Sequence, residues 1–565
     1  DANTTGGSNT AVGRSALGSN TTADNNTAVG REALYGNTTG SENVAVGSYA
    51  LDANTTADNN VGVGYGALGA NTTGANNTAV GNYALDAATT ADDNTAFGYV
   101  ALSENTTGTR NVAVGTYSLD ANTTASNNVA VGYGTLGVNT TSGNNVAVGY
   151  NALTLNTGAD NTAVGAYSLD ANTTAISNTA VGKAALGANT TGSYNVAVGQ
   201  NAGLNNTTAA DITAIGYGAL QANTTANSNT GVGTNALNAN TTGTANVAVG
   251  RRALYVSTTG DYNTAVGYNA LDANTTADGN TAVGTDALGA NTEGHSNTAL
   301  GKDSLKLNVD GDRNTALGYG ALNVANSPND NTMVGYFAGV ALTTGAQNTA
   351  VGSYALDANT TAGGNIAMGY ASLGANTTGE WNTALGTNAM QTNTTGHYNV
   401  AVGYAALDAN TTGENNVAMG RDALGANTTA AHNLGIGRSS LGANTTGTKN
   451  IAIGNYSLDA NTTANNNISI GYNALTDNTT GANNTALGVS SLANNTDADY
   501  NTGLGYQTLF ANTTGASNTA VGKNALVALT TASKTVAVGA NAGASLTTGE
   551  NSVAIGYDAL TTETT

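Results

Sequence analysis

One unit of about 17 residues repeats along the whole chain, and this short period restricts the fold more than any other feature of the sequence. With the asparagine of "NTAVG" as position 1, repeats begin at Asn9 and recur every 17 residues to Ser552, with one residue dropped in the repeat at 145–160. There are 33 repeats in 565 residues. We therefore predict a single continuous repeat region over 1–565, with no cap or anchor domain.

The residue types at fixed positions favour strands over helices. Position 5 is glycine in every repeat, position 4 is always apolar and position 9 is nearly always leucine. Helical repeats need more apolar positions, less Gly, Asn and Thr, and a longer period. We predict an all-β parallel β-solenoid in which each 17-residue coil has two short strands, at positions 1–4 and 7–10. A tight turn at the position-5 glycine and a longer turn through "NTTG" join them.

The side chains at positions 4 and 9 are predicted to point inward. In the first coils this core ladder consists of Val12, Leu17, Val29, Leu34, Val46 and Leu51. The predicted turn glycines of the first coils are Gly13, Gly30, Gly47 and Gly64. Two bulky side chains per coil stabilise by only ~1.5–3 kcal/mol each, so we also expect hydrogen-bond ladders and lateral association of several chains.

Position 12 is the asparagine of "NTT" and allows two interpretations. It matches the N-glycosylation motif, or it forms a ladder of amides that bond from coil to coil. The first members are Asn20, Asn37, Asn54 and Asn71. Leu342 and Leu546 replace this asparagine in coils whose position-9 leucine has become Gly339 or Gly543. This exchange indicates that position 12 can face the interior, and it favours the ladder.

Position 10 carries aspartate in eight coils, and no two of these coils are neighbours. Stacked coils would place equivalent side chains only ~4.8 Å apart, where like charges repel. The stacking model therefore explains the alternation, although duplication of a two-coil unit would leave the same trace.

Positions 6 and 7 hold most of the tyrosines and most of the few cations, and they are predicted to face outward. Members of this contact stripe are Tyr65, Tyr99, Tyr133, Tyr150, Arg251 and Arg252. We interpret the stripe as a solvated face or a seam between chains, with stacking on surface glycans as the alternative.

Charge and composition argue against several classes of function. A formal net charge of −21 is opposite to the basic surface of a nucleic-acid binder, and no apolar run approaches the ~20 residues of a membrane helix. His295, His397 and His432 fall in separate coils, so we predict no metal site, no cofactor and no enzymatic activity. Calcium at the Asp and Asn positions is the one metal considered. An acidic, cysteine-free chain rich in Thr and Asn suggests an extracellular or cell-surface location.

Two stretches resemble a known family. "NIAIGNYSL" (450–458) and "SVAIGYDAL" (552–560) are similar to the head repeats of trimeric autotransporter adhesins, and also to the "NTAVGYNAL" arrays in shafts of phage and marine bacterial fibre proteins. The resemblance covers every coil and implies a left-handed β-roll in a homotrimer, displayed outside the cell and used for adhesion or reach. The adhesin coil is shorter, so the added "NTT" enlarges one turn here.

The sequence therefore predicts a structural fibre or filament rod that gives length and stiffness and takes part in adhesion. Its expected partner is the chain itself, as a homotrimer or a head-to-tail filament. The alternative is a ligand-binding solenoid that recognises glycans or ice. Adjacent threonines such as Thr21 and Thr22 would point to opposite sides of a strand, which argues against the flat Thr-x-Thr ranks of solenoid ice binders.

Overall fold

The structure is a computed structural model and describes residues 2–562. In this range the chain forms 33 strands of three residues each and no helix. The chain divides into two compact units, an N-terminal unit (Asp1–Asn280) and a C-terminal unit (Thr281–Thr565). Each unit is described by itself.

The N-terminal unit contains one strand in each coil. Its strands are β1 (Thr10–Val12), β2 (Thr27–Val29), β3 (Val44–Val46), β4 (Val61–Val63), β5 (Thr78–Val80), β6 (Thr95–Phe97), β7 (Val112–Val114), β8 (Val129–Val131), β9 (Val146–Val148), β10 (Thr162–Val164), β11 (Thr179–Val181), β12 (Val196–Val198), β13 (Thr213–Ile215), β14 (Thr230–Val232), β15 (Val247–Val249) and β16 (Thr264–Val266).

The C-terminal unit repeats the same arrangement. Its strands are β17 (Thr281–Val283), β18 (Thr298–Leu300), β19 (Thr315–Leu317), β20 (Thr332–Val334), β21 (Thr349–Val351), β22 (Ile366–Met368), β23 (Thr383–Leu385), β24 (Val400–Val402), β25 (Val417–Met419), β26 (Leu434–Ile436), β27 (Ile451–Ile453), β28 (Ile468–Ile470), β29 (Thr485–Leu487), β30 (Thr502–Leu504), β31 (Thr519–Val521), β32 (Val536–Val538) and β33 (Val553–Ile555).

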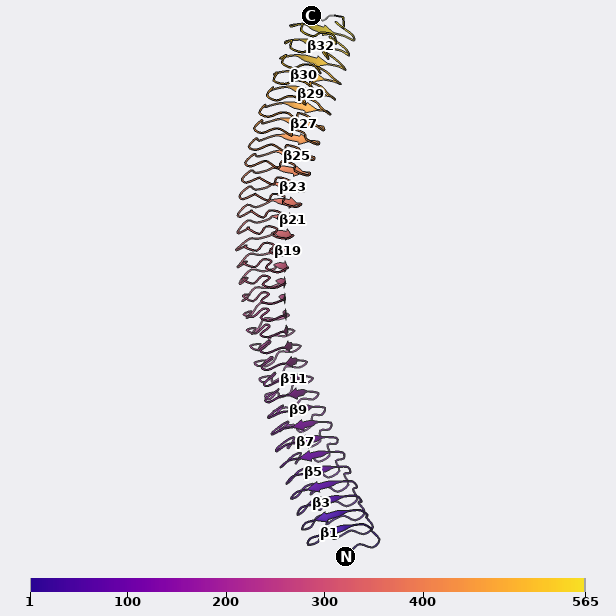
Figure 1. Ribbon diagram of the computed structural model, residues 1–565. Helices are drawn as coiled ribbons and strands as arrows, with labels where there is room; N and C mark the ends of the chain where they lie inside the picture. Colours follow the sequence, from indigo (N-terminus) through magenta and orange to yellow (C-terminus); the bar gives the residue numbers. More distant parts are fainter. Residues whose placement is uncertain (1, 563–565) are drawn as a thin grey trace. The chain divides into compact units, whose positions relative to one another are not determined.

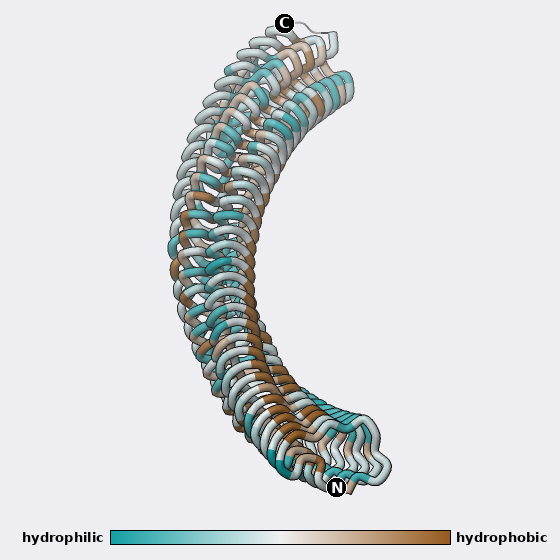
Figure 2. The backbone as a smooth tube through the Cα atoms, turned by 60° about the horizontal axis from the view of Figure 1, so that its bottom comes forward, coloured by the Kyte–Doolittle hydropathy of each residue, from teal (hydrophilic) through white to brown (hydrophobic). Residues whose placement is uncertain are grey.

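Within each unit, successive strands pair in parallel and in register, which confirms the predicted β-solenoid (Figure 1). Ala28 of β2, for example, pairs with Ala45 of β3. The turns are also bonded from coil to coil, because the Leu34 amide donates to the Ala50 carbonyl at 3.0 Å. The short coil keeps the register, since β9 and β10 pair position for position. Figure 2 shows residues of like hydropathy lined up in rows along the coils.

The predicted second strand at positions 7–10 is wrong, because this segment forms turns and bends, and no strand, in every described coil. Positions 7 and 9 adopt the left-handed conformation, as at Glu32 (φ 58°) and Leu34 (φ 51°). Ala33 and Leu34 are consecutive and both fully buried. A strand would send consecutive side chains to opposite faces, whereas two left-handed residues turn both of them inward.

In the one strand of each coil, position 3 faces the core, and not position 4 as predicted. The alanine at position 3, such as Ala28, is fully buried. The residues on either side of it point outward, with Val12 57% exposed and Val46 37% exposed. Of the predicted core ladder, Leu17, Leu34 and Leu51 are therefore confirmed as buried, and Val12, Val29 and Val46 are wrong. The interior of a 17-residue coil is narrow, and beside the leucine it accepts only a small side chain at position 3.

In one coil, different side chains fill the same interior volume. Position 3 there is Met333, position 9 is Gly339 and position 12 is Leu342. Met333 and Leu342 are fully buried, and a Cβ added to Gly339 would lie 2.7 Å from the Met333 sulfur. The methionine therefore fills the space that leucine leaves, and this exchange was the signal in the sequence that position 3 faces inward.

The predicted turn glycines are confirmed at the bend that ends each strand. Gly13, Gly30, Gly47 and Gly64 have φ values of 132°, 142°, 139° and 137°. A Cβ on Gly30 would lie 2.6 Å from the carbonyl carbon of Gly47 in the next coil. Only glycine suits this position, because both the φ value and the close approach of two backbones exclude a side chain.

Candidate functional site

The position-12 asparagines form a buried ladder, as the favoured interpretation predicted. The Asn54 Nδ2 atom donates to Asn37 Oδ1 at 2.9 Å and to the Ala57 carbonyl at 3.1 Å. Asn20, Asn37, Asn54 and Asn71 are all buried. Because Nδ2 is also the atom to which an N-linked sugar attaches, this geometry favours the ladder over a glycan.

The ladder is interrupted where another residue takes position 12. Three such breaks come directly after an asparagine of the preceding coil: Ala88 after Asn71, Ala325 after Asn308 and Leu529 after Asn512. The Oδ1 atoms of these three asparagines are buried and accept no hydrogen bond from the residues that the structure describes. An unsatisfied buried acceptor costs about 1–3 kcal/mol, so each interruption weakens the stack locally.

A second asparagine ladder at position 1 was not predicted. The Asn43 amide donates to Asn26 Oδ1 at 2.9 Å, and Asn43 Nδ2 donates to the Ala57 carbonyl at 2.8 Å. The two ladders therefore converge on the Ala57 carbonyl, and likewise on the Ala23 carbonyl in the first coil. One substitution could have shown that position 1 faces inward. The coil with Gly203 in place of the position-9 leucine is followed by a coil with Ile212 at position 1, and the Ile212 Cδ1 atom lies 3.5 Å from a Cβ added to Gly203.

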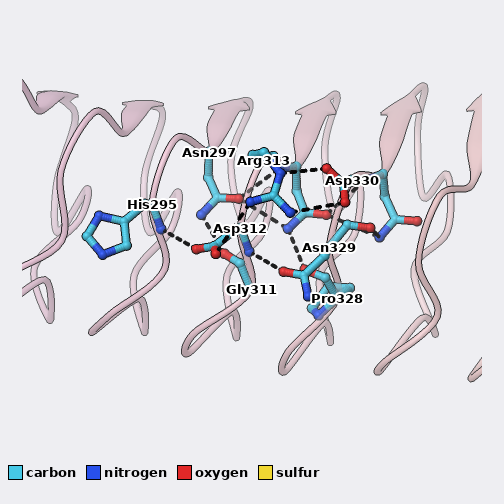
Figure 3. Close-up of polar contacts among 10 residues, drawn as sticks. His295, Asn297, Gly311, Asp312, Arg313, Pro328, Asn329 and Asp330 are labelled. Atoms are coloured by element: carbon cyan, nitrogen blue, oxygen red, sulfur yellow. Dashed lines mark hydrogen bonds and ion pairs between the residues drawn. The ribbon is translucent and has the colours of Figure 1, made fainter.

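The long turn carries a third polar ladder, at position 16 (Figure 3). Asp312 Oδ1 accepts the His295 amide at 2.8 Å, and Asn329 Oδ1 accepts the Asp312 amide at 2.7 Å. At position 17, Arg313 forms a bidentate pair with Asp330, with N–O distances of 2.7 and 3.1 Å. These side chains bond to the neighbouring coil, which gives them a structural role.

The predicted contact stripe does face outward, and its rings touch along the stack. Tyr65, Tyr99, Tyr133 and Tyr150 are each about half exposed. Tyr117 and Tyr133 meet edge to face with ring centroids 6.0 Å apart, and Tyr133 stacks on Tyr150 at 5.5 Å. A row of exposed aromatic rings is a surface suited to contact with a partner or ligand.

The cations of the stripe lie over tyrosine rings. Arg251 is 5.6 Å from the centroid of Tyr268, and Arg252 is 4.6 Å from that of Tyr255. Arg252 also lies 3.6 Å from an Asp272 carboxylate oxygen. Both predicted arginines therefore make cation–π contacts.

The position-10 aspartates lie half-buried beside this stripe. Burial is the largest cause that raises the pKa of seven of them, and their own backbone amides partly oppose the shift. They are Asp52, Asp86, Asp120, Asp170, Asp357, Asp408 and Asp459. Asp357 Oδ1 would lie 3.3 Å from a Cβ on Gly374 in the next coil. The small residue after each aspartate thus leaves room for the carboxylate, which adds a steric reason for the alternation.

We expect mild acid to strengthen the contribution of these aspartates to stability. A pKa raised in the folded state means that the folded chain binds more protons than the unfolded chain, so stability falls as pH rises through the raised values. The gain on acidification is complete near the unfolded pKa of about 3.9. Urea unfolding between pH 7 and pH 4 measures the effect.

The control for this experiment is a variant in which all seven aspartates are replaced by asparagine. It should be more stable than the native chain at pH 7, and the difference should shrink as pH falls. A difference that stays constant with pH, or that grows on acidification, would contradict the assignment.

Neither a metal site nor a membrane span emerges from residues 2–562. In this range no three or more His, Asp and Glu side chains gather in a way that could hold a metal ion. The same range holds no helix of the length and hydropathy that crossing a membrane requires.

The comparisons with known proteins add no relationship. No protein-family model matches the sequence, and no curated protein matches it significantly.

Proposed function

We propose that the chain is a structural, self-associating fibre rod that gives length and stiffness outside the cell and takes part in adhesion. The observation that carries this proposal is the uniformity of the stack. Within each unit the strands repeat the same pairing, and the coils repeat the same backbone ladders and, except at Leu560 in the last coil, the same buried leucine or its substitute. Such repetition provides a long stiff element.

The outer face of the strands supports lateral association of several copies. Positions 2 and 4 of all 33 coils carry only Thr or apolar residues and never a charge. Many of these side chains are more than a third exposed, including Phe97, Leu300 and Met368. An uncharged apolar strip on a chain of net charge −21 is typical of an interaction surface.

The strip is large enough to bind a second copy of the chain. Three residues at ~3.3 Å each and a strand spacing of ~4.8 Å give roughly 50 Å² per coil. The 16 strands of the N-terminal unit thus present roughly 750 Å², close to the ~800 Å² that each partner buries in a stable interface. A homotrimer, as the resemblance implies, is the assembly we propose.

Mass measurement in solution tests the assembly. The native chain should run as a multiple of its 55.3 kDa in light scattering. Replacing Val46, Val114 and Val198 by glutamate places charges along the strip, because these three side chains point outward. This variant should shift toward the single-chain mass, since buried unpaired charges are costly.

The matched control replaces three outward residues of the contact stripe, Tyr65, Tyr99 and Tyr150, by serine. It should keep the native mass. A native chain that is monomeric at micromolar concentration, or equal dissociation of both variants, would contradict the proposed seam. Antibody labelling of intact cells that produce the protein tests the location separately.

The alternative of ice binding receives little support from the threonines. The position-13 hydroxyls are used within the stack, as Thr38 Oγ1 donates to the Thr55 carbonyl at 2.9 Å. The position-14 threonines, such as Thr39, are exposed as a rank, whereas the outward threonines at position 2, such as Thr27, are interrupted by residues such as Val44. Glycan or ice recognition stays a prediction, and the rod is the function we favour.

A further inference from the structure

Four places on the contact stripe share one arrangement of side chains, which we call a notch. Each notch has a tyrosine at position 7, an aspartate at position 10 of the same coil, and a tyrosine at position 6 of the next coil whose ring meets the first ring edge to face. Tyr83, Asp86 and Tyr99 occupy the same positions but are not counted as a notch, because the Tyr83 ring packs against Tyr65 of the preceding coil. The four sets are Tyr49, Asp52 and Tyr65; Tyr117, Asp120 and Tyr133; Tyr354, Asp357 and Tyr370; and Tyr456, Asp459 and Tyr472.

The two rings of each notch stand nearly at right angles. Their centroids are 5.7, 6.0, 6.1 and 6.4 Å apart, with interplanar angles of 76°, 90°, 83° and 84°. The same geometry therefore recurs twice in each unit.

The third notch opens into a groove on the surface. Tyr354, Asp357 and Tyr370 line it together with Gly374 and Gln391 of the following coils. Gly374 lies under the carboxylate and leaves the space beside the two rings unfilled. In the second notch Gly137 has the same place, and a Cβ there would lie 3.5 Å from Asp120 Oδ1.

The first and fourth notches receive a cation from the chain itself. Arg31 lies 5.1 Å from the centroid of Tyr49, and Arg438 lies 5.3 Å from that of Tyr456. Both arginines occupy position 6 of the preceding coil. In the second and third notches that position holds Tyr99 and Tyr336, so the arginine is replaced by an aromatic ring.

We propose that the second and third notches bind an organic cation, an alkylammonium or guanidinium group supplied by another molecule. The tyrosine faces attract it, and the carboxylate of Asp120 or Asp357 neutralises it. The half-buried position of these carboxylates and the net charge of −21 both favour a cation over a neutral sugar. This site is independent of the proposed rod function, because it lies on positions 6, 7 and 10 and not on the strand face.

Titration of the full chain at low ionic strength tests the site, with heat or tyrosine fluorescence as the readout. The probes are tetramethylammonium, n-butylammonium and N-butylguanidinium, with tert-butanol as the neutral probe. We expect saturable binding of the cations at two sites per chain, and binding of tert-butanol at least about tenfold weaker. Hexalysine is a further probe, and it tests whether the bound ammonium group can come from the lysine side chains of a peptide as well as from a small amine.

Two variants and one control assign the binding to the notches. Asp120→Asn with Asp357→Asn should weaken cation binding about five- to tenfold. Asp92→Asn with Asp499→Asn changes the net charge equally but lies on the position-16 ladder, where the amide Oδ1 can still accept the backbone bond. This control should bind as the native chain does.

Filling the notches provides a test that leaves every charge in place. Gly137→Thr with Gly374→Thr should abolish binding, because the threonine hydroxyl would occupy the carboxylate. It should fold, because Thr476 already follows Asp459 in the fourth notch, where its Oγ1 atom donates to Asp459 Oδ1 at 2.6 Å. Equal affinity for tert-butanol, equal loss in the position-16 control, full binding by the filled variant, or saccharides that bind with the same dependence on Asp120 and Asp357 would each overturn the proposal.

Discussion

Replacing Gly64 by alanine is expected to open the stack locally and to cause one of the two largest losses of stability of any single substitution in the chain. Gly64 has a φ of 137°, in a region that costs other residues about 1–3 kcal/mol. The new Cβ would also lie 2.6 Å from the Gly81 carbonyl carbon, and relieving such overpacking costs a further ~1–3 kcal/mol. The two coils cannot separate without breaking the ladder between them.

Hydrogen exchange measured by mass spectrometry is the suitable readout, because long repeat arrays need not unfold in a single step. Protection should fall most in the coils on either side of Gly64. The matched control is Gly62→Ala in the same coil, at position 3, where Ala45 and Ala79 stand in the neighbouring coils. Similar exchange in both variants would contradict the role given to the turn glycine.

The second large effect is expected for Leu51→Ala, with a loss of about 2–5 kcal/mol. Leu51 is fully buried, and its Cγ and Cδ1 atoms lie 3.3 Å from a Cβ added to Gly62 of the next coil. The alanine would leave a cavity in a coil whose other buried apolar side chains are alanines, such as Ala45 and Ala50. Such a narrow interior can collapse only by displacing the backbone ladders.

Val46→Thr in the same coil is the control for the leucine variant. Val46 points outward, and position 2 of many coils already carries threonine on the same face. Its expected effect is below about 0.5 kcal/mol, because threonine has nearly the same shape as valine and already lies on this face in other coils. Urea unfolding and hydrogen exchange measure both variants, and a comparable loss for Val46→Thr would mean that the valines belong to the core after all.

Much of the architecture can be predicted from the periodicity alone. A fixed 17-residue period with one glycine that cannot vary predicts parallel, in-register stacking, and the structure confirms it. The buried asparagine at position 12 was also predictable, because Leu342 and Leu546 replace it where position 9 loses its leucine. Met333 at position 3 and Ile212 at position 1 also accompany the loss of a position-9 leucine, and they indicate in the same way that positions 3 and 1 face inward.

The contact stripe was predicted as a surface but not as a set of sites. Outward tyrosines and arginines follow from their positions in the repeat. The right-angled pair of Tyr354 and Tyr370 beside Asp357 depends on residues from two coils. The spacing places these residues on adjacent coils, but the same spacing at Tyr83, Asp86 and Tyr99 gives no edge-to-face pair, so only the tertiary structure identifies the notches.

By itself the sequence determined the period, the parallel stacking, the turn glycine and the leucine of the core. Only the tertiary structure decided which face of the strand is inside. Strand alternation separates Ala28 from Val29 without saying which one is buried, and the narrow closed coil selects the smaller. The closed coil also holds Leu34 at a φ of 51°, a conformation that costs an isolated leucine about 1–2 kcal/mol. Burial of the side chain, worth about 1.5–3 kcal/mol, and the amide bond to Ala50 offset that cost only once the next coil is in place.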